Sequence, residues 1–111
     1  MEQTLESYVG PDGTMRGVNG AWQALLGLPA ASLEGSFFPN LIHLADHSRM
    51  LKLFAGASTS GRAATESLCL RQDGSWLAVR WEVELVGSPC QYRVRGQPVD
   101  KAVPSCYILV G

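Results

Sequence analysis

The spacing of apolar residues changes from a helical period in the first half of the chain to an alternating period in the second. Within the segment 21–26, AWQALL, apolar residues recur at helical spacing, which predicts one short helix. Asn19 precedes this segment and is the expected N-cap. Gly27 and Pro29 follow it, and they predict a left-handed C-terminal cap and a stop.

Further helical segments are predicted between positions 32 and 60. Two short helical turns at 32–38 and 39–44 are separated by glycine and proline, and a longer helix starts at Asp46. The apolar face of this longer helix carries Met50, Leu53 and Phe54. We expect it to end in a loop of small residues over 56–61.

Two antiparallel hairpins are predicted. Strands at 7–10 and 15–18 flank the turn tripeptide Pro11-Asp12-Gly13, and strands at 65–71 and 76–85 flank Asp73-Gly74. A two-residue Asp-Gly loop would place Leu70 opposite Leu77 and Glu66 opposite Trp81. The predicted core face is then Leu68, Leu70, Leu77, Val79, Trp81, Val83 and Leu85, and the opposite face is Ser67, Cys69, Arg71, Trp76, Ala78, Arg80 and Glu82.

The C-terminal part of the sequence is less regular. Residues 92–95 alternate and could extend the sheet, but glycines and prolines interrupt 86–105, which we interpret as an insertion or long loop before a last strand at 106–110. The element order predicts an α+β domain over 1–111, with a five-stranded antiparallel sheet and short helices packed on one face.

Composition and charge narrow the function classes. A net charge of −1 gives no reason to expect nucleic acid or an anionic membrane as a partner. The apolar runs are too short to span a bilayer and the N-terminus lacks a signal-peptide pattern, so we expect a cytoplasmic protein. The three cysteines show no CxxC spacing, which favours buried thiols over a disulfide framework or a metal site.

Several short motifs occur together in a characteristic order from about Ser7 to the end of the chain. They are Pro11-Asp12-Gly13, Val18-Asn19, Ala21-Trp22, Leu25-Leu26-Gly27, Leu33-Glu34-Gly35, Leu41-Ile42-His43, Asp46, Arg49, and Arg71-Gln72-Asp73-Gly74-Ser75 with Trp76 and Trp81. In this order they resemble the PAS family of sensory domains. The resemblance implies a small cavity between helices and sheet, and a sensing or dimerising role beside an output domain. In bacterial-type signalling that output domain is a histidine kinase, a cyclic-dinucleotide enzyme or a transcription regulator.

Neither haem nor flavin is expected, although a haem- or flavin-binding sensor is kept as an alternative. The photosensors of the resembled family carry a cysteine after the second glycine, where this chain has Ser36 and Phe37. His43, His47 and Met50 are the residue types that ligate haem iron. His47 and Met50 lie three apart on one helix and cannot occupy opposite faces of one iron. We therefore interpret both histidines as solvated or helix-terminal.

Catalysis is not expected. His43, Asp46, His47 and Ser48 are triad residue types within six positions, but neighbouring side chains on one helical turn diverge, whereas triads assemble from separate elements. We interpret Asp46 as a helix cap, with Arg49 on the exposed face. No phosphate loop and no metal-ligand spacing accompanies them, so no metal is expected.

The predicted function is therefore a non-catalytic sensory or interaction module, with a purely structural dimerisation scaffold as a second alternative. The candidate ligand-binding residues are Trp22, Leu26, Leu41, Ile42, Met50, Leu53, Glu66, Leu68, Leu70, Val79 and Trp81. These side chains either line an apolar cavity, as small-ligand sites do, or simply close-pack as a core. A homodimer is predicted through the outer sheet face, with Arg71, Trp76, Ala78 and Arg80 as the candidate interface.

Overall fold

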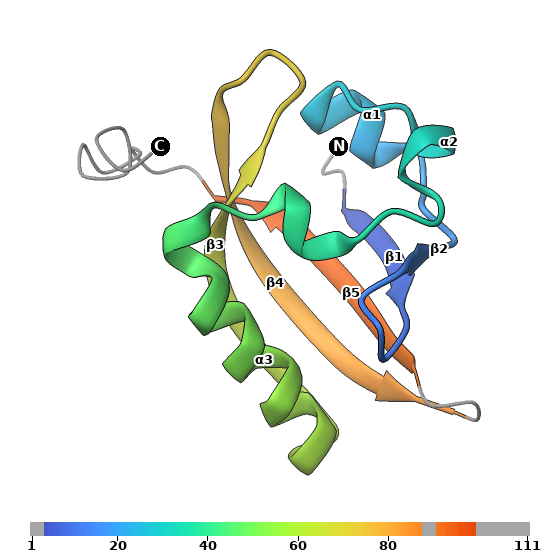
Figure 1. Ribbon diagram of the computed structural model, residues 1–111, viewed down its shortest axis with the longest axis vertical. Coiled ribbons are helices and arrows are strands. Elements are labelled where there is room, and N and C mark those ends of the chain that lie inside the picture. The colour runs from blue at the N-terminus through green and yellow to red at the C-terminus, as the bar shows by residue number, and fades with distance from the viewer. Residues whose placement is uncertain (1–3, 88–90, 100–111) are drawn as a thin grey trace.

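The computed structural model describes residues 4–87 and 91–99, which form one antiparallel sheet with helices packed on one face (Figure 1). The elements in chain order are β1 (Leu5–Val9), β2 (Met15–Arg16), α1 (Ala21–Leu26), α2 (Ala30–Leu33), η1 (Phe38–Leu41), η2 (Leu44–Asp46), α3 (His47–Ser60), β3 (Arg62–Leu70), β4 (Trp76–Val86) and β5 (Gln91–Pro98). No helix within the described residues is long and apolar enough to cross a membrane.

The five strands are arranged in the order β2-β1-β5-β4-β3, and every neighbouring pair is antiparallel. The predicted α+β class, with five strands and short helices on one face, is confirmed. The C-terminal strand β5 lies between β1 and β4, so the two ends of the described chain meet in the middle of the sheet (Figure 1). The core lies between this sheet and α1, η1 and α3.

The N-terminal hairpin and the first helix form as predicted, with one difference at the helix start. Gly27 closes α1 in the left-handed conformation, with φ of 76°. The N-cap is Gly20 rather than Asn19. The Asn19 side chain instead accepts from Glu6 N–H (3.2 Å) and donates to Thr4 O (2.9 Å), so it holds the helix entry against β1.

The helix α3 is longer than its sequence predicts. The expected loop over 56–61 is wrong, because α3 continues to Ser60 and ends at Gly61, whose φ is 96°. Ala57 is fully buried, which explains the continuation: the last turns still present an apolar side chain to the core. The hydroxyl of Ser60 donates to Gly56 O, four residues back in the helix.

The β3–β4 hairpin differs from prediction by one residue in register. Leu70 lies opposite Trp76, not Leu77, because the loop encloses three residues, 72–74. Arg71 N–H donates to Ser75 O, and the Asp73 carboxylate accepts from both N–H and O–H of Ser75. Gly74 has φ of 88°, so a turn followed by a left-handed glycine replaces the two-residue turn.

This one-residue difference reverses the faces of β3. Ser67 lies opposite Val79 and Thr65 opposite Trp81, so the inward side chains of β3 are those at 63, 65, 67 and 69. The prediction that Glu66, Leu68 and Leu70 face the core is wrong. Glu66 lies opposite Arg80 on the outer face of the sheet.

The interpretation of 86–105 as an insertion or long loop is wrong for the residues of β5, Gln91–Pro98. This strand pairs with β1 on one side and with β4 on the other. The predicted last strand at 106–110 lies outside the described residues. Gly96, which suggested a break in the strand, is a residue of β5. The indole of Trp81 lies on it, and a Cβ at Gly96 would come within 2.5 Å of that ring.

Replacing Gly96 with alanine is expected to destabilise the domain by about 1–3 kcal/mol, because a methyl group would force Trp81 and Val79 out of position. Gly20→Ala is the matched control: a Cβ at Gly20 meets nothing within 4 Å, and its φ is −70°. Urea unfolding, compared at constant m-value, measures both variants. Equal midpoints for the two variants would contradict the proposed contact.

Candidate functional site

The space between sheet and helices is filled by aromatic side chains. Trp22, Phe38 and Trp81 are each at most 1% exposed. The ring centroids of Trp22 and Trp81 are 6.0 Å apart, and Phe38 meets Trp81 edge-on at 5.2 Å and 88°. Such edge-to-face contacts are favourable arrangements of buried rings. The centre of the domain is therefore an aromatic core.

The polar atoms of both buried indoles are satisfied within the protein. Trp81 Nε1–H donates to Ser67 Oγ at 2.8 Å, and Trp22 Nε1–H donates to Glu6 O at 3.0 Å. Since these donors already have partners, they offer no hydrogen bond to a guest molecule.

Eight of the eleven predicted ligand-binding residues come together in this core, and three do not. The eight are Trp22, Leu26, Leu41, Ile42, Met50, Leu53, Val79 and Trp81. The other three, Glu66, Leu68 and Leu70, project from the opposite face of β3. Whether the eight also contact a ligand stays a prediction.

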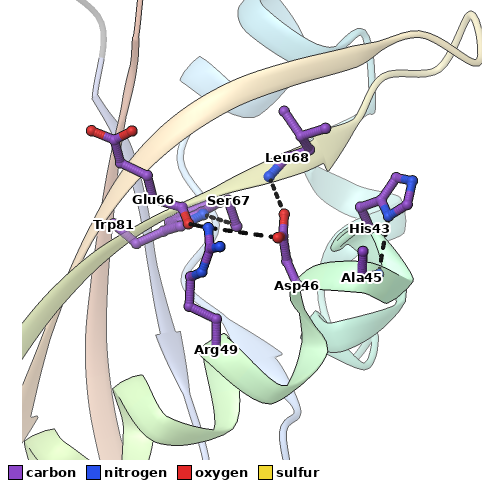
Figure 2. Close-up of polar contacts among 8 residues, drawn as sticks. All are labelled: His43, Ala45, Asp46, Arg49, Glu66, Ser67, Leu68 and Trp81. Carbon is purple, nitrogen blue, oxygen red and sulfur yellow. Dashed lines mark hydrogen bonds and ion pairs between the residues drawn. The ribbon is translucent and has the colours of Figure 1, made fainter. Parts of the chain in front are cut away.

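Asp46 attaches the start of α3 to the edge strand β3. Its fully buried carboxylate accepts from Leu68 N–H at 2.8 Å, and Figure 2 shows it between this backbone and the Arg49 guanidinium. Arg49 lies 3.6 Å from Asp46 and donates to Glu66 O at 2.9 Å, while His43 N–H donates to Leu68 O at 3.0 Å. Asp46 occupies the N-cap position of α3, as predicted, but its side chain makes no cap hydrogen bond and is directed at β3 instead. We call His43, Asp46 and Arg49 the β3 clamp.

An apolar groove lies between η1, the β1–β2 turn and α3. It consists of two adjoining pockets of about 260 and 240 Å³. The residues lining both pockets are Phe37, Phe38, Pro39, Leu51 and Phe54. The first pocket adds Asn40, Ile42, His47 and Met50, and the second adds Val9, Gly10, Pro11, Asp12, Gly13 and Tyr92.

Two exposed apolar side chains border this groove. Phe37 is 49% exposed and Leu51 is 73% exposed, and both line the two pockets. A Cβ on Gly13 would collide with the Phe37 ring, so the absence of a side chain at Gly13 leaves the space that this ring occupies. Sequence reasoning missed the groove. The adjacent Phe37 and Phe38 were its visible signal, since only one of two neighbouring residues faces a core.

No protein-family model matches the sequence, and no curated protein matches it. Solved structures do match. The PAS domain of a protein from Colwellia psychrerythraea superimposes with a TM-score of 0.80 at 13% identity, over 89% of this chain and 88% of that one. The PAS domain of an HTR-like protein from Haloarcula marismortui gives 0.74 at 20% identity, over 86% of both chains.

A third similar structure is the PAS-B domain of Drosophila melanogaster Cycle, in a tryptophan-to-alanine variant with bound glycerol. It superimposes with a TM-score of 0.77 at 12% identity, over 86% of this chain and 99% of that one. The chain has the PAS fold. The resemblance read from the sequence motifs is thereby confirmed for the fold.

The two histidines of the domain support local structure. His43 is buried rather than solvated: Ala45 N–H donates to its Nδ1 at 3.0 Å, and its ring centroid lies 4.6 Å from that of Trp76, with the two rings inclined by 56°. His47 starts α3 and bonds through Nε2 to Ile42 O at 2.9 Å. Among the described residues, no group of three or more His, Cys, Asp or Glu side chains could hold a metal ion. Binding of haem or flavin stays untested.

The predicted interface residues differ strongly in accessibility. Arg80 is exposed, but Ala78 is buried, Trp76 is half-buried against His43, and Arg71 is half-buried. The accessible part of the outer sheet face lies nearer β1 and β5, where Thr4, Glu6, Arg80, Glu82, Arg95 and Gln97 line a polar depression of about 280 Å³.

Cys69 is a buried thiol, as the cysteine pattern predicts, but it faces the core and not the opposite sheet face on which the predicted register placed it. Burial raises its pKa to about 12, so the thiol stays protonated and unreactive near neutral pH. Cys90 and Cys106 lie outside the described residues.

Replacing Asp46 with alanine is expected to cost about 1–3 kcal/mol of unfolding free energy, because Leu68 N–H would lose its acceptor in a buried position. Asp46→Asn keeps an acceptor oxygen at this position, so its free energy of unfolding should fall less than that of Asp46→Ala. Lys52→Ala, on the exposed side of α3, is the control and should change little. Thermal or urea unfolding of the three variants gives the ranking, and an Asp46→Ala variant as stable as Lys52→Ala would rule out the clamp.

Proposed function

We propose that this PAS domain is a non-catalytic sensory and interaction module that binds small apolar molecules in the groove between η1 and α3. The observation that carries the proposal is the pair of adjoining apolar pockets bordered by Phe37 and Leu51. Ligand sites in proteins are mostly apolar with a few polar groups, and here Asn40, His47 and Asp12 are polar residues of the lining.

The packed interior supports a site in the groove. A guest between sheet and helices would have to displace Trp22, Phe38 or Trp81, whose burial and ring contacts stabilise the fold. A guest in the groove contacts Phe38 and Phe54 from outside and leaves these contacts intact.

The geometry also supports a role without catalysis. Asp46, the acidic member of the triad-like run, is directed at Leu68 N–H and Arg49 rather than at a nucleophile. A sensor needs only two arrangements of differing affinity for the ligand. In the proposed mechanism, occupancy of the groove changes the position of α3 relative to η1, and an output domain of a cytoplasmic signalling protein receives this change.

Binding to the groove can be tested with indole as a small aromatic probe, followed by NMR. Indole is expected to shift the signals of Met50 and Phe54. Leu51→Ser should weaken binding by roughly five- to tenfold, because a buried contact is lost. Leu44→Ser is the matched control, since Leu44 is 72% exposed and lines neither pocket. Equal weakening by both variants, or shifts confined to Trp22 and Trp81, would refute the groove as the site.

A homodimer through the outer sheet face is the second part of the proposal. Glu6, Glu82 and Arg95 lie on neighbouring strands of this face, and Arg93 lies 3.6 Å from Glu84. In a two-fold dimer each residue can meet its complement on the other copy, so a face bearing both signs can pair with itself.

Sedimentation velocity at micromolar concentration is expected to show a dimer, and Arg80→Glu should convert it to a monomer by placing like charges beside Glu82 and Glu6. Lys52→Glu on α3 controls for the change in net charge and should leave the dimer intact. A strictly monomeric wild-type protein would exclude this assembly.

A further inference from the structure

The outward side of α3 carries exposed leucines. Leu44, in the turn before the helix, and Leu51, two helical turns later, are 72% and 73% exposed. With Ser48, Ala55 and Ser58 they form a row of exposed positions at alternating spacings of four and three, which we call the α3 ridge. This spacing keeps side chains on one side of a helix and is the spacing of seams between packed helices.

The ridge adjoins the groove through Leu51. Leu51 belongs to both, and Phe37, 49% exposed, lies across the groove from the helix. The opposite side of α3 is already occupied, because Met50, Leu53 and Ala57 are buried in the core. In Figure 1, α3 lies along the outside of the domain. Exposed apolar surface of this kind marks interaction sites.

The charge beside the ridge is basic. Lys52 is exposed next to it, and positions 47–60 contain no Asp or Glu. Arg49 is already paired with the buried Asp46, 3.6 Å away, and donates to Glu66 O, so Lys52 carries the charge beside the ridge. Asp12, the acidic residue of the groove lining, lies on the opposite wall, in the β1–β2 turn. A partner beside α3 therefore needs acidic residues, whereas a second ridge would bring basic residues against basic residues.

Backbone groups at the open edges of both outer strands already have partners at several positions. On β2, Met15 N–H donates to Ser36 O, and Gly35 N–H donates to Met15 O. On β3, the clamp occupies the backbone groups of Glu66 and Leu68. The ridge and the groove instead offer side chains to a partner, as an apolar groove does to an amphipathic helix.

We propose that the α3 ridge and the adjoining groove dock an amphipathic helix whose apolar stripe is flanked by acidic residues. The inference rests on the proposed interaction role and names its partner class. The stripe packs on Leu44 and Leu51, and the flanking carboxylates face Lys52.

Two synthetic helical peptides with the same leucine stripe test the proposal, one flanked by glutamates and one by lysines. By fluorescence anisotropy the acidic peptide should bind more tightly. Lys52→Glu should shift the preference toward the basic peptide, and Leu44→Ser and Leu51→Ser should each weaken binding about tenfold. Tyr8→Ser, on the outer sheet face, is the control and should leave binding unchanged.

The same variants separate this proposal from the small-molecule site. Leu44→Ser should weaken binding of the acidic peptide but not of indole. A protein that binds the acidic peptide but not indole would therefore contradict the small-molecule site and still support docking on the ridge. Equal binding of both peptides, or a preference unmoved by Lys52→Glu, would overturn the proposal. So would binding to phosphatidylserine vesicles that is lost in Leu44→Ser, or self-association lost in that variant.

Discussion

The contact of Trp81 with Gly96 is the constraint on which the rest of the interior depends. The indole lies on the backbone of β5 because Gly96 has no side chain, and Trp22 and Phe38 pack against its remaining surface. Its Nε1–H must also find an acceptor in this apolar environment, since an unpaired buried donor is costly. Ser67 Oγ supplies that acceptor. The aromatic core thus requires a glycine on one neighbouring strand and a hydroxyl on the other.

The register of the β3–β4 hairpin follows from the same constraint. A two-residue loop would place Glu66 opposite Trp81 and bury a carboxylate among aromatic rings, which is strongly unfavourable. With three residues in the loop, Thr65 lies opposite Trp81 and Ser67 reaches its indole nitrogen. The Asp73 side chain stabilises this loop by accepting from Ser75, which lowers the pKa of Asp73 because the carboxylate form is the better acceptor. Local turn chemistry and the tertiary core therefore favour the same register.

These couplings explain how far the sequence alone predicts the fold and the site. The element order, the left-handed Gly27 and the core residues of α1 follow from local patterns, because caps and periodicity act over a few residues. The alternation at 92–95 indicated part of β5, but the strand was interpreted as interrupted at Gly96 because this glycine is explained only by a side chain on another strand. Asn19 was misassigned as a cap because its partners, Thr4 and Glu6, come from β1. The groove was missed because it is a relation between η1 and α3 that no periodicity encodes.

The two walls of the groove are attached to opposite edges of the sheet, which suits a sensor. The η1 wall is bound to the β1–β2 turn, where Phe38 N–H donates to Gly13 O at 2.9 Å. The α3 wall is bound to β3 through Asp46. The strands β1, β5 and β4 separate these attachments. In the proposed mechanism, a ligand or helix that fits one separation of the walls better than another stabilises that separation and the sheet twist that goes with it. A densely packed interior favours this behaviour, because a rigid aromatic core transmits a displacement of one wall to the sheet instead of absorbing it.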